Sequence, residues 1–560
     1  MQNEILRFPP AKFLRISREV SDNAAPSRRM KQHQDAPTTT AGFRSRERRR
    51  FQLLQAILVG GIAGIVAVAF QWSLFELDHL RSRLLHPFLE NGWWAVSVVL
   101  LICVSIVTLV ARMTARFCPE ASGSGIPHLK GVLMNLRELR WWRLLPVKFV
   151  GGVLAIGSGL SLGREGPTVQ MGGAVGKMIA DRLGLSTKAT PLLISVGAGA
   201  GLSAAFNAPL AGFLFVIEEL HFELTSLPYV TALAASITAD TLARYVSGQL
   251  PSFRVFAHAT PSLAALPWFA LLGVAAGMAA FIFKRALIRG VRRDGVLASV
   301  PDACFAPLAG LAGGMALVWL PEIAGAGHGT AEMVINESTP GKLGLSFVLL
   351  LLAGKFLLTV VSYLAKVPGG IFAPMLAIGS LTGYAFGLVG NTVFPGAGIP
   401  PSMFSVIGMA SFFSGVVHAP LTGIVLILEM TANFKLLFPM MIASLIAFYI
   451  SEWLGGKPVY ESLLNEDLRK SGPPPILFAE PSELHLIVEE GSEMENREIR
   501  SVSLPEGILI VSIRRLGRHL VPSGSTILHA GDALDVVVSG DVSLFTQEIR
   551  ELISKKQSVS

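Results

Sequence analysis

The sequence predicts an all-α protein that crosses a membrane many times, with broken helices and two inverted repeats, followed by a small C-terminal domain that is β-rich or α/β. Composition, helix-length apolar stretches and an internal repeat support this fold class. Of the 560 residues, 51% are hydrophobic and only 15% are charged, whereas soluble domains are usually about a quarter charged. The 56 glycines fit close helix packing in a membrane.

Residues 1–50 form a basic tail that we predict to be disordered. They hold 12 Lys and Arg against 5 Asp and Glu, so they carry +7 of the net charge of +8. Arg48, Arg49 and Arg50 directly precede the first apolar stretch, which places the N-terminus in the cytoplasm by the positive-inside rule. No groove-reading motif follows the tail, so nucleic-acid binding is not expected.

Residues 51–470 form the predicted membrane transport domain. A spanning helix needs about 20 apolar residues, and four stretches are long enough: 51–75, 93–117, 266–287 and 347–364. Others are short and interrupted by Gly or Pro, as at 149–162, 194–205 and 403–417. Broken helices persist at membrane depth where they are buried in protein or line a polar cavity. This pattern indicates a transporter or a channel.

Short blocks of this domain occur twice, in the same order. Ala208–Gly212 recurs as Ala419–Gly423, and the carboxyl residues Glu218 and Glu429 follow at equal spacing. Upstream, the matching positions are Lys148-Phe149 with Lys355-Phe356, Gly163 with Gly370, and Pro167 with Pro374. Repeated halves with broken helices are common in transporters, where they are often inverted; the sequence alone does not show the inversion.

The chain changes character at a proline-rich linker, residues 471–476, and 477–560 are predicted to form a soluble regulatory domain. Residues 507–513 and 535–538 resemble strands, and turn residues occur at 522–524 and 531–532. No long apolar stretch follows residue 453. The domain is therefore expected in the cytoplasm, like the N-terminus.

Three glycine-containing segments are candidate anion sites. In Gly123–Pro127, Ser124 lies between two glycines, so its backbone and hydroxyl can approach an ion closely; the alternative is a flexible turn that starts a helix. In Gly370–Pro374, the backbone N–H groups of Ile371 and Phe372 would precede a helix that begins near Pro374, and a helix N-terminus attracts anions.

The third segment, Gly163–Pro167, adds a carboxylate to the same arrangement. The backbone near Arg164 and Gly166 would face an anion, and Glu165 would occupy the anion position and leave it when protonated. The alternative is an acidic residue that stabilises the helix dipole. Ionisable residues within a membrane domain are usually functional.

Two further positions are candidates on weaker grounds. Glu218-Glu219 ends an apolar run, and adjacent buried carboxyl groups are suited to accept protons; a solvated pair at the membrane interface is an equal alternative. Tyr460 is an isolated tyrosine after the last span and carries no signal by itself.

Together these segments resemble the CLC family of chloride channels and transporters over about residues 51–470. The segments GSGIP, GREGP and GIFAP occur in order, with Phe206–Gly212 between them and GGKPxY after them. The resemblance implies the CLC fold, a homodimer with one pore per subunit, and chloride ligands at Ser124, Ile371, Phe372 and Tyr460. It further implies a gating and external proton glutamate at Glu165 and an internal proton-transfer glutamate at Glu219.

The resemblance favours a proton-coupled chloride antiporter over a passive, glutamate-gated chloride channel, because channels of the family typically lack the carboxylate at Glu219. A bacterial inner membrane is the expected location. Lys130 stands where bacterial antiporters often carry an acidic residue, so the sequence offers no partner for Lys148. A membrane sensor that acts through the C-terminal domain is a third reading.

The C-terminal text from about Glu489 to Asp541 resembles the TrkA-C (RCK C-terminal) domain, which implies an unknown small ligand or a dimer-stabilising role. The membrane part shows no nucleophile–base set, and the three cysteines lack metal-like spacing. An enzyme, a cofactor and a metal are therefore not expected.

Overall fold

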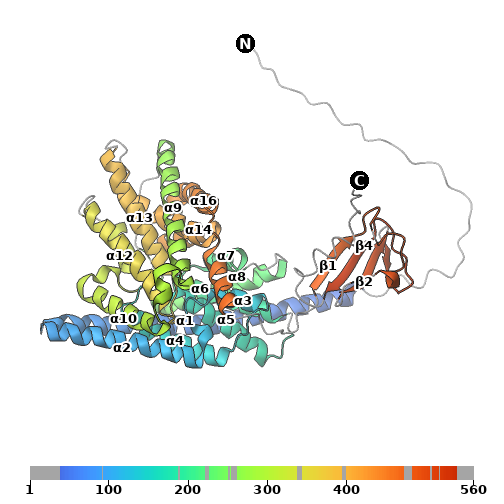
Figure 1. The fold of residues 1–560 in the computed structure, drawn as a ribbon, viewed down its shortest axis with the longest axis horizontal. Helices are drawn as coiled ribbons and strands as arrows, with labels where there is room; N and C mark the ends of the chain where they lie inside the picture. Colours follow the sequence, from blue (N-terminus) through green and yellow to red (C-terminus); the bar gives the residue numbers. More distant parts are fainter. Residues whose placement is uncertain are drawn as a thin grey trace, which may run out of the picture. The chain divides into compact units, whose positions relative to one another are not determined.

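The chain is described by a computed structural model, shown in Figure 1. It describes residues 38–90, 92–186, 189–220, 226–249, 253, 261–336, 343–393, 399–471, 482–492, 494–502, 504, 508–515 and 518–538. Of the tail predicted to be disordered, residues 1–50, the first 37 lie outside the described residues, whereas 38–50 form the start of a helix. Nearly all of the proline-rich linker also lies outside the described residues.

Seven helices among the described residues are long and apolar enough to cross a membrane. They are α1 (Thr38–Leu89), α2 (Trp93–Phe117), α9 (Leu266–Arg292), α10 (Asp302–Trp319), α12 (Leu345–Leu364), α13 (Phe372–Val393) and α16 (Leu437–Trp453). The four long stretches predicted from sequence lie in α1, α2, α9 and α12. The other three were not predicted, because Pro and Gly interrupt the apolar runs of α10 and α13 and Pro439 interrupts that of α16.

Ten further helices, most of them shorter, are described in the membrane part. They are α3 (Ile126–Leu133), α4 (Trp141–Gly157), α5 (Glu165–Arg182), α6 (Thr190–Phe206), α7 (Pro209–Glu218), α8 (Ser226–Ser247), α11 (His328–Ile335), α14 (Pro401–Val417), α15 (Pro420–Thr431) and α17 (Val459–Ser471). The predicted broken segments fall in α4, α6 and α14. Proline occupies the first turn of α6, α7, α14 and α15, where its missing N–H costs no hydrogen bond.

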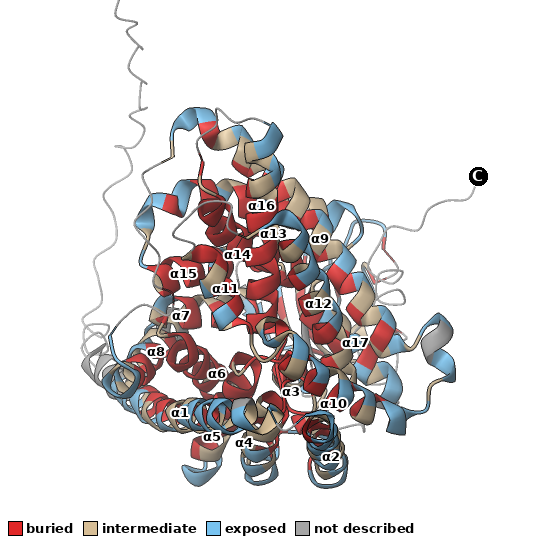
Figure 2. Cartoon of the chain, turned by 90° about the vertical axis from the view of Figure 1, so that its left-hand side faces the viewer, coloured by how far each residue is buried: buried red, intermediate tan, exposed pale blue. Residues whose placement is uncertain are grey.

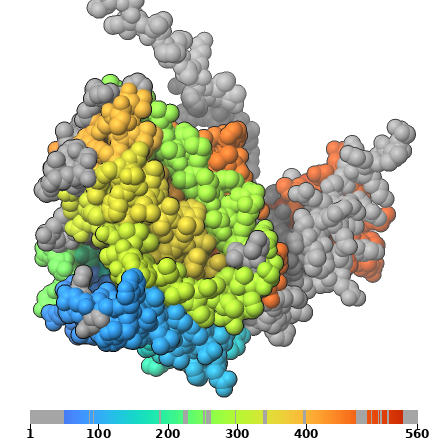
Figure 3. Space-filling model, turned by 60° about the vertical axis from the view of Figure 1, so that its left-hand side comes forward, coloured from blue at the N-terminus to red at the C-terminus, as the bar shows by residue number. Residues whose placement is uncertain are grey.

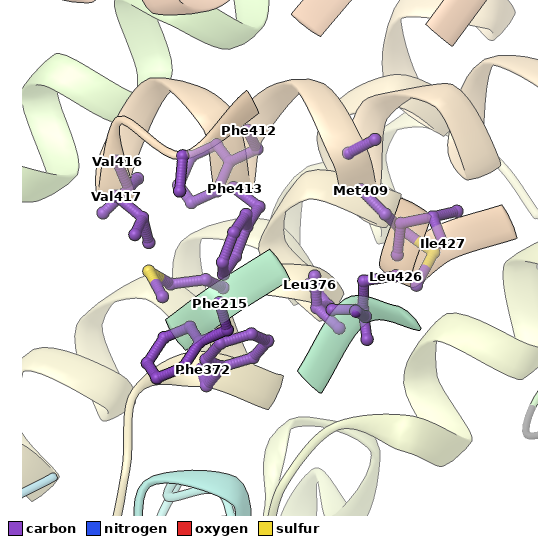
Figure 4. Packing of buried hydrophobic residues seen from close by; sticks show 14 of the residues in the cluster. Phe215, Phe372, Leu376, Met409, Phe412, Phe413, Val416, Val417, Leu426 and Ile427 are labelled. Atoms are coloured by element: carbon purple, nitrogen blue, oxygen red, sulfur yellow. The ribbon is translucent and has the colours of Figure 1, made fainter. Parts of the chain in front are cut away.

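The largest buried shares belong to α5, α6 and α14, and Figure 2 shows α6 and α14 surrounded by helices with exposed outer faces. Aromatic and aliphatic side chains of α7, α13, α14 and α15 interlock there, and the rings of Phe372 and Phe413 are 4.6 Å apart (Figure 4). Large apolar side chains such as Leu101 and Ile282 point outward, as expected of a surface that lipid covers.

The two halves pack against each other along several helices. On one side, α2 of the first half packs on α10 of the second; Figure 3 shows blue residues of the first helices beside green and yellow residues of the second half.

Glu218 and Glu429, which the repeat had matched, make reciprocal contacts between the halves. The Glu218 carboxylate accepts hydrogen bonds from the N–H groups of Leu421 and Thr422 at 3.1 and 2.7 Å. The Glu429 carboxylate accepts from Leu210 and Ala211 at 3.1 and 2.8 Å. Each carboxylate therefore caps the N-terminus of the other half's helix, α15 or α7. This reciprocity is what an approximate two-fold axis between two halves of one plan produces.

A further repeated block connects the segment before α3 with the segment before α11. Pro119-Glu120 starts a short 3-10 helix in the first half, and Pro321-Glu322 does so in the second. Each is followed by a Gly-x-Gly turn whose second glycine, Gly125 or Gly327, has a positive φ of 85° or 92° and begins the helix. In this alignment, the second half carries alanine where the first carries Ser124.

The C-terminal domain is a four-stranded antiparallel sheet in the order β1-β4-β2-β3. Its strands are β1 (Ser482–Ile487), β2 (Ile508–Arg515), β3 (Arg518–Leu520) and β4 (Ala533–Val538). The two predicted strands lie in β2 and β4, whereas β1 and β3 were not predicted. Ile510, Ile513, Leu534 and Val536 contribute to a separate small core.

Candidate functional site

Backbone pairing joins the three glycine-containing segments at one point between the halves. The N–H of Gly123 donates to the carbonyl of Val367 at 3.0 Å, and the N–H of Gly369 donates back to Gly123 at 3.1 Å. Gly163 and Gly370 exchange two hydrogen bonds of 2.6 and 2.8 Å. The turns that lead into α3, α5 and α13 are therefore held together, although 247 residues separate Gly123 from Gly370.

Glycine is required where these turns touch. An alanine at position 166 would place its Cβ 2.5 Å from Oγ of Ser124 and 3.1 Å from Cα of Gly370. Both approaches are shorter than van der Waals contact allows. The absence of a side chain at Gly166 thus brings the Ser124 hydroxyl against the first turn of α5.

Two buried hydroxyl groups face this point. The side chains of Ser124 and Tyr460 are fully buried, and neither hydroxyl has a hydrogen-bond partner in the described part of the chain. The Tyr460 hydroxyl lies close to Ser124. Buried polar groups are nearly always paired, so two unpaired hydroxyl donors at one point indicate a place for a ligand that accepts hydrogen bonds.

Glu165 is the first residue of α5, and its carboxylate is completely buried. One carboxylate oxygen lies against Gly163 and near the backbone N of Ala373 in the first turn of α13, and neither carboxylate oxygen has a hydrogen-bond partner in the described part of the chain. The carboxylate therefore occupies the N-terminal end of α13, where unpaired N–H groups favour negative charge. Ile371 and Phe372, which begin this turn, are buried at the same place.

Arg164 is the charged neighbour of this carboxylate. Its Nε lies 3.9 Å from Oε1 of Glu165, and its Nη2 donates to the carbonyl of Ala205 at 3.4 Å. Its side chain is 21% exposed while that of Glu165 is 0% exposed. The arginine is therefore placed between the buried carboxylate and the more accessible surroundings.

Glu219 lies apart from Glu165 and has a partner of its own. It follows the last residue of α7, and its Oε1 is 2.8 Å from Nζ of Lys130, on α3. Both side chains are at most 5% exposed. Tyr460 lies near both Glu165 and Glu219.

The pair Glu218-Glu219 thus divides into two different roles. Glu218 caps α15 through three hydrogen bonds, one of them from the Thr422 hydroxyl at 2.8 Å. Glu219 instead turns to Lys130. The alternative of a solvated pair does not describe Glu219, whose side chain is buried by the fold.

Lys148 and its repeat counterpart Lys355 each donate hydrogen bonds to backbone carbonyls of the segment before a short helix, α3 or α11. The Lys148 ammonium donates to the carbonyls of Ala121 and Gly123 at 3.0 and 2.7 Å. The Lys355 ammonium donates to Ile323 and Gly325 at 3.0 and 2.7 Å. Carbonyl dipoles are therefore the partners of Lys148 that the sequence did not reveal.

A cavity of about 720 Å³ opens beside the Ser124 turn. Gly123, Gly125 and Tyr363 line it, with the charged residues Arg112, Glu120, Arg293, Asp302, Lys366, Asp467 and Lys470. Basic residues are slightly more numerous than acidic ones in this wall, which favours entry of an anion. The sequence analysis missed these cavity residues, the Lys130 partner of Glu219 and the second Gly-x-Gly turn. The second turn could have been found, because Pro-Glu occurs before both turns.

Comparison with known proteins gives two domain matches. Residues 106–452 match the family model described as voltage gated chloride channel. Residues 485–546 match the model of the TrkA-C domain.

Curated relatives and solved structures resemble the chain over the membrane part. The H(+)/Cl(−) exchange transporter ClcA of Vibrio cholerae is 38% identical over 442 residues, 76% of this chain and 92% of the relative. The Salmonella arizonae protein of the same name is 36% identical over 433 residues, 75% and 89% of the two chains. A slow cyanobacterial Cl⁻/H⁺ antiporter superposes with a TM-score of 0.70 at 34% identity, covering 75% and 98%. A eukaryotic CLC transporter shares the fold, with a TM-score of 0.62 at 22% identity and 74% of each chain covered.

Proposed function

The chain belongs to the voltage gated chloride channel family, and we propose that it exchanges chloride for protons across a membrane. The observation that carries this proposal is the buried Glu165 carboxylate at the N-terminus of α13, beside the unpaired hydroxyl groups of Ser124 and Tyr460. A carboxylate and a chloride ion both suit this position, so one displaces the other. Protonation of Glu165 removes its negative charge, so the helix N-terminus no longer attracts the side chain and chloride can take its place.

The donors around the site bind an anion without a full countercharge. Hydroxyl groups of Ser124 and Tyr460 and backbone N–H groups of Ile371 and Phe372 supply partial positive charge, and the N-termini of α5 and α13 add to it. The backbone at Arg164 and Gly166 continues this donor surface at the first turn of α5. Because these donors carry only partial positive charge, the anion can be bound and then released, as transport requires.

Glu219 completes the proposed proton path. It is a second buried carboxylate, and Tyr460 lies near both it and Glu165. Protons would reach Glu219 from the cytoplasmic side and pass to Glu165, which exchanges them with the outside. A passive channel requires no such second carboxylate.

We further propose a bacterial inner membrane as the location, with both termini in the cytoplasm, and a homodimer with one pore in each subunit. The basic residues before α1 support this orientation through the positive-inside rule. The TrkA-C domain then lies in the cytoplasm, where a small ligand or a partner domain could regulate transport.

The first experiment uses purified protein in liposomes with an outward chloride gradient, a lightly buffered exterior and a clamped membrane potential. Proton uptake driven by chloride exit, and absent with sulfate, is the expected result. Chloride exit without proton movement would identify a passive channel.

Replacing either carboxylate tests its role in coupling. Glu165→Ala and Glu219→Ala are each expected to lower chloride-driven proton uptake at least tenfold, while chloride flux persists. Glu218→Ala is the matched control, because its carboxylate caps α15 and lies outside the proposed path. Proton uptake that survives in Glu219→Ala would show that protons enter by another route.

A further inference from the structure

The ion pair between Lys130 and Glu219 is not explained by the proton path alone. Oε1 of Glu219 lies 2.8 Å from Nζ of Lys130, and both side chains are at most 5% exposed. Among the described residues, no other carboxylate lies within ion-pair distance of Lys130. A buried lysine bound this closely to the proposed proton acceptor stabilises the form of Glu219 that lacks the proton.

The other carboxyl groups around Glu219 oppose its negative charge, whereas the protonated tyrosine beside it is neutral. Glu218 precedes it on the chain, Glu461 approaches from α17, and Tyr460 of α17 also faces it. Glu219 follows the last residue of α7, where the carbonyl end of a helix disfavours a carboxylate. Lys130 is therefore the counter-ion that makes a charged Glu219 tolerable in this apolar surrounding.

The position of Lys130 connects Glu219 with the anion site. Lys130 lies in the last turn of α3, an eight-residue helix that begins directly after Ser124 and Gly125. Helix α17, which carries Tyr460 and Leu464, packs against α3, and Leu464 lies near Gly131. One short helix thus presents an anion ligand at its start and the counter-ion of the proton acceptor near its end.

We propose that Lys130 is a positioning residue that controls proton loading of Glu219: the ion pair must open before Glu219 can take up a transported proton. This inference rests on the proposed proton/chloride exchange and deepens it. Because the lysine favours unprotonated Glu219, it sets the pH range in which exchange runs. Removing the lysine charge lets Glu219 hold a proton at higher pH.

The test measures exchange in liposomes as a function of a pH that is equal on both sides. Lys130→Met removes the charge and keeps the length of the side chain, and it is expected to move the pH of half-maximal exchange upward by about one unit or more. Lys130→Arg keeps the charge and is expected to keep the wild-type profile. Lys177→Met is the control, because Lys177 pairs with Asp181 in a more exposed part of α5.

A structural role for Lys130 would give a different pattern. It would lower the rate at every pH and leave the midpoint in place, which would overturn the proposal. Lys130→Gln guards against a folding defect in Lys130→Met, since it retains a hydrogen bond without the charge and is expected to show the same upward shift. An unshifted midpoint in Lys130→Gln counts equally against the proposal.

A Glu219→Gln background separates an effect on protons from an effect on the anion. Chloride flux in the double variant Lys130→Met/Glu219→Gln is expected to equal that of Glu219→Gln alone. A further loss of chloride flux in the double variant would place Lys130 on the anion path and overturn the inference. Wild-type protein that moves chloride without protons would instead refute the exchange function itself, before any variant is compared.

Discussion

At the scale of single residues, the site depends on groups whose ordinary partners are missing or distant in sequence. The hydroxyls of Ser124 and Tyr460 are buried without hydrogen bonds, and Gly166 is needed because a Cβ would meet the serine. Motif reasoning could find Ser124, Glu165, Ile371 and Phe372, since each lies in a glycine-containing segment. It could not find the Lys130 partner of Glu219, because 89 positions separate them and nothing local specifies the contact.

The C-terminal domain contains a charged pair that predicts a pH-dependent stability. Burial alone would work against a charged Asp532. Hydrogen bonds from the Arg515 guanidinium at 2.8 and 2.7 Å and from the His529 N–H at 2.9 Å outweigh this effect. Together they hold the pKa of Asp532 below its ordinary value of 3.8. The pair therefore stabilises the fold above about pH 4, and this contribution is lost as the pH falls through the lowered pKa.

Asp532→Asn is expected to destabilise the domain by about 1–3 kcal/mol at neutral pH, because it weakens a charged hydrogen-bond pair. Hydrogen exchange of the β2 and β4 amides in the full-length protein measures the change. The difference from wild type should shrink below about pH 4. Glu498→Gln is the control, since its pair with Arg500 is exposed and such pairs contribute about 0–1 kcal/mol. A difference that stays constant with pH would contradict the prediction.

At the scale of helices and strands, the sequence predicted the elements with uninterrupted patterns and missed those with interrupted ones. The long apolar stretches became α1, α2, α9 and α12. Helix α13 was missed as a full span because Pro374 and several glycines interrupt its apolar run. Strands β1 and β3 were missed because β3 has three residues and polar residues interrupt β1.

The cap that Glu218 provides for α15 predicts a loss of stability without a loss of coupling. Glu218→Ala leaves the N–H groups of Leu421 and Thr422 without their acceptor, which is expected to cost about 1–2 kcal/mol. Thermal unfolding in detergent should show a lower midpoint, while the proton-to-chloride ratio in liposomes stays at the wild-type value. Loss of coupling in Glu218→Ala would show that this carboxylate takes part in proton transfer.

At the scale of the whole molecule, the transport residues and the C-terminal sheet belong to separate cores. All candidate ion-binding and proton-transfer residues lie between Ser124 and Tyr460, and the sheet has its own cluster around Ile513 and Leu534. The sequence predicted this division from the change in charge and hydropathy. It did not predict how the two halves of the membrane part contact each other, because those contacts join residues about 200 positions apart.

A chain that ends at Ser471 is therefore expected to retain coupled exchange. Its proton-to-chloride ratio in liposomes should equal that of the full-length protein, because all candidate ion-binding and proton-transfer residues precede residue 471. Gel filtration verifies that the shortened protein is folded. Loss of exchange in a folded, shortened protein would show that the C-terminal domain is part of the transport machinery.

The reciprocal caps have a consequence for how such a molecule can arise. Glu218 of the first half accepts hydrogen bonds from the first turn of α15 in the second half. Glu429 of the second half accepts them from the first turn of α7 in the first half. Neither half is a finished fold by itself. A primordial single-repeat protein would have had to pair with a second copy of itself about a two-fold axis, each copy capping a helix of the other, and gene fusion would have preserved that mutual dependence within one polypeptide.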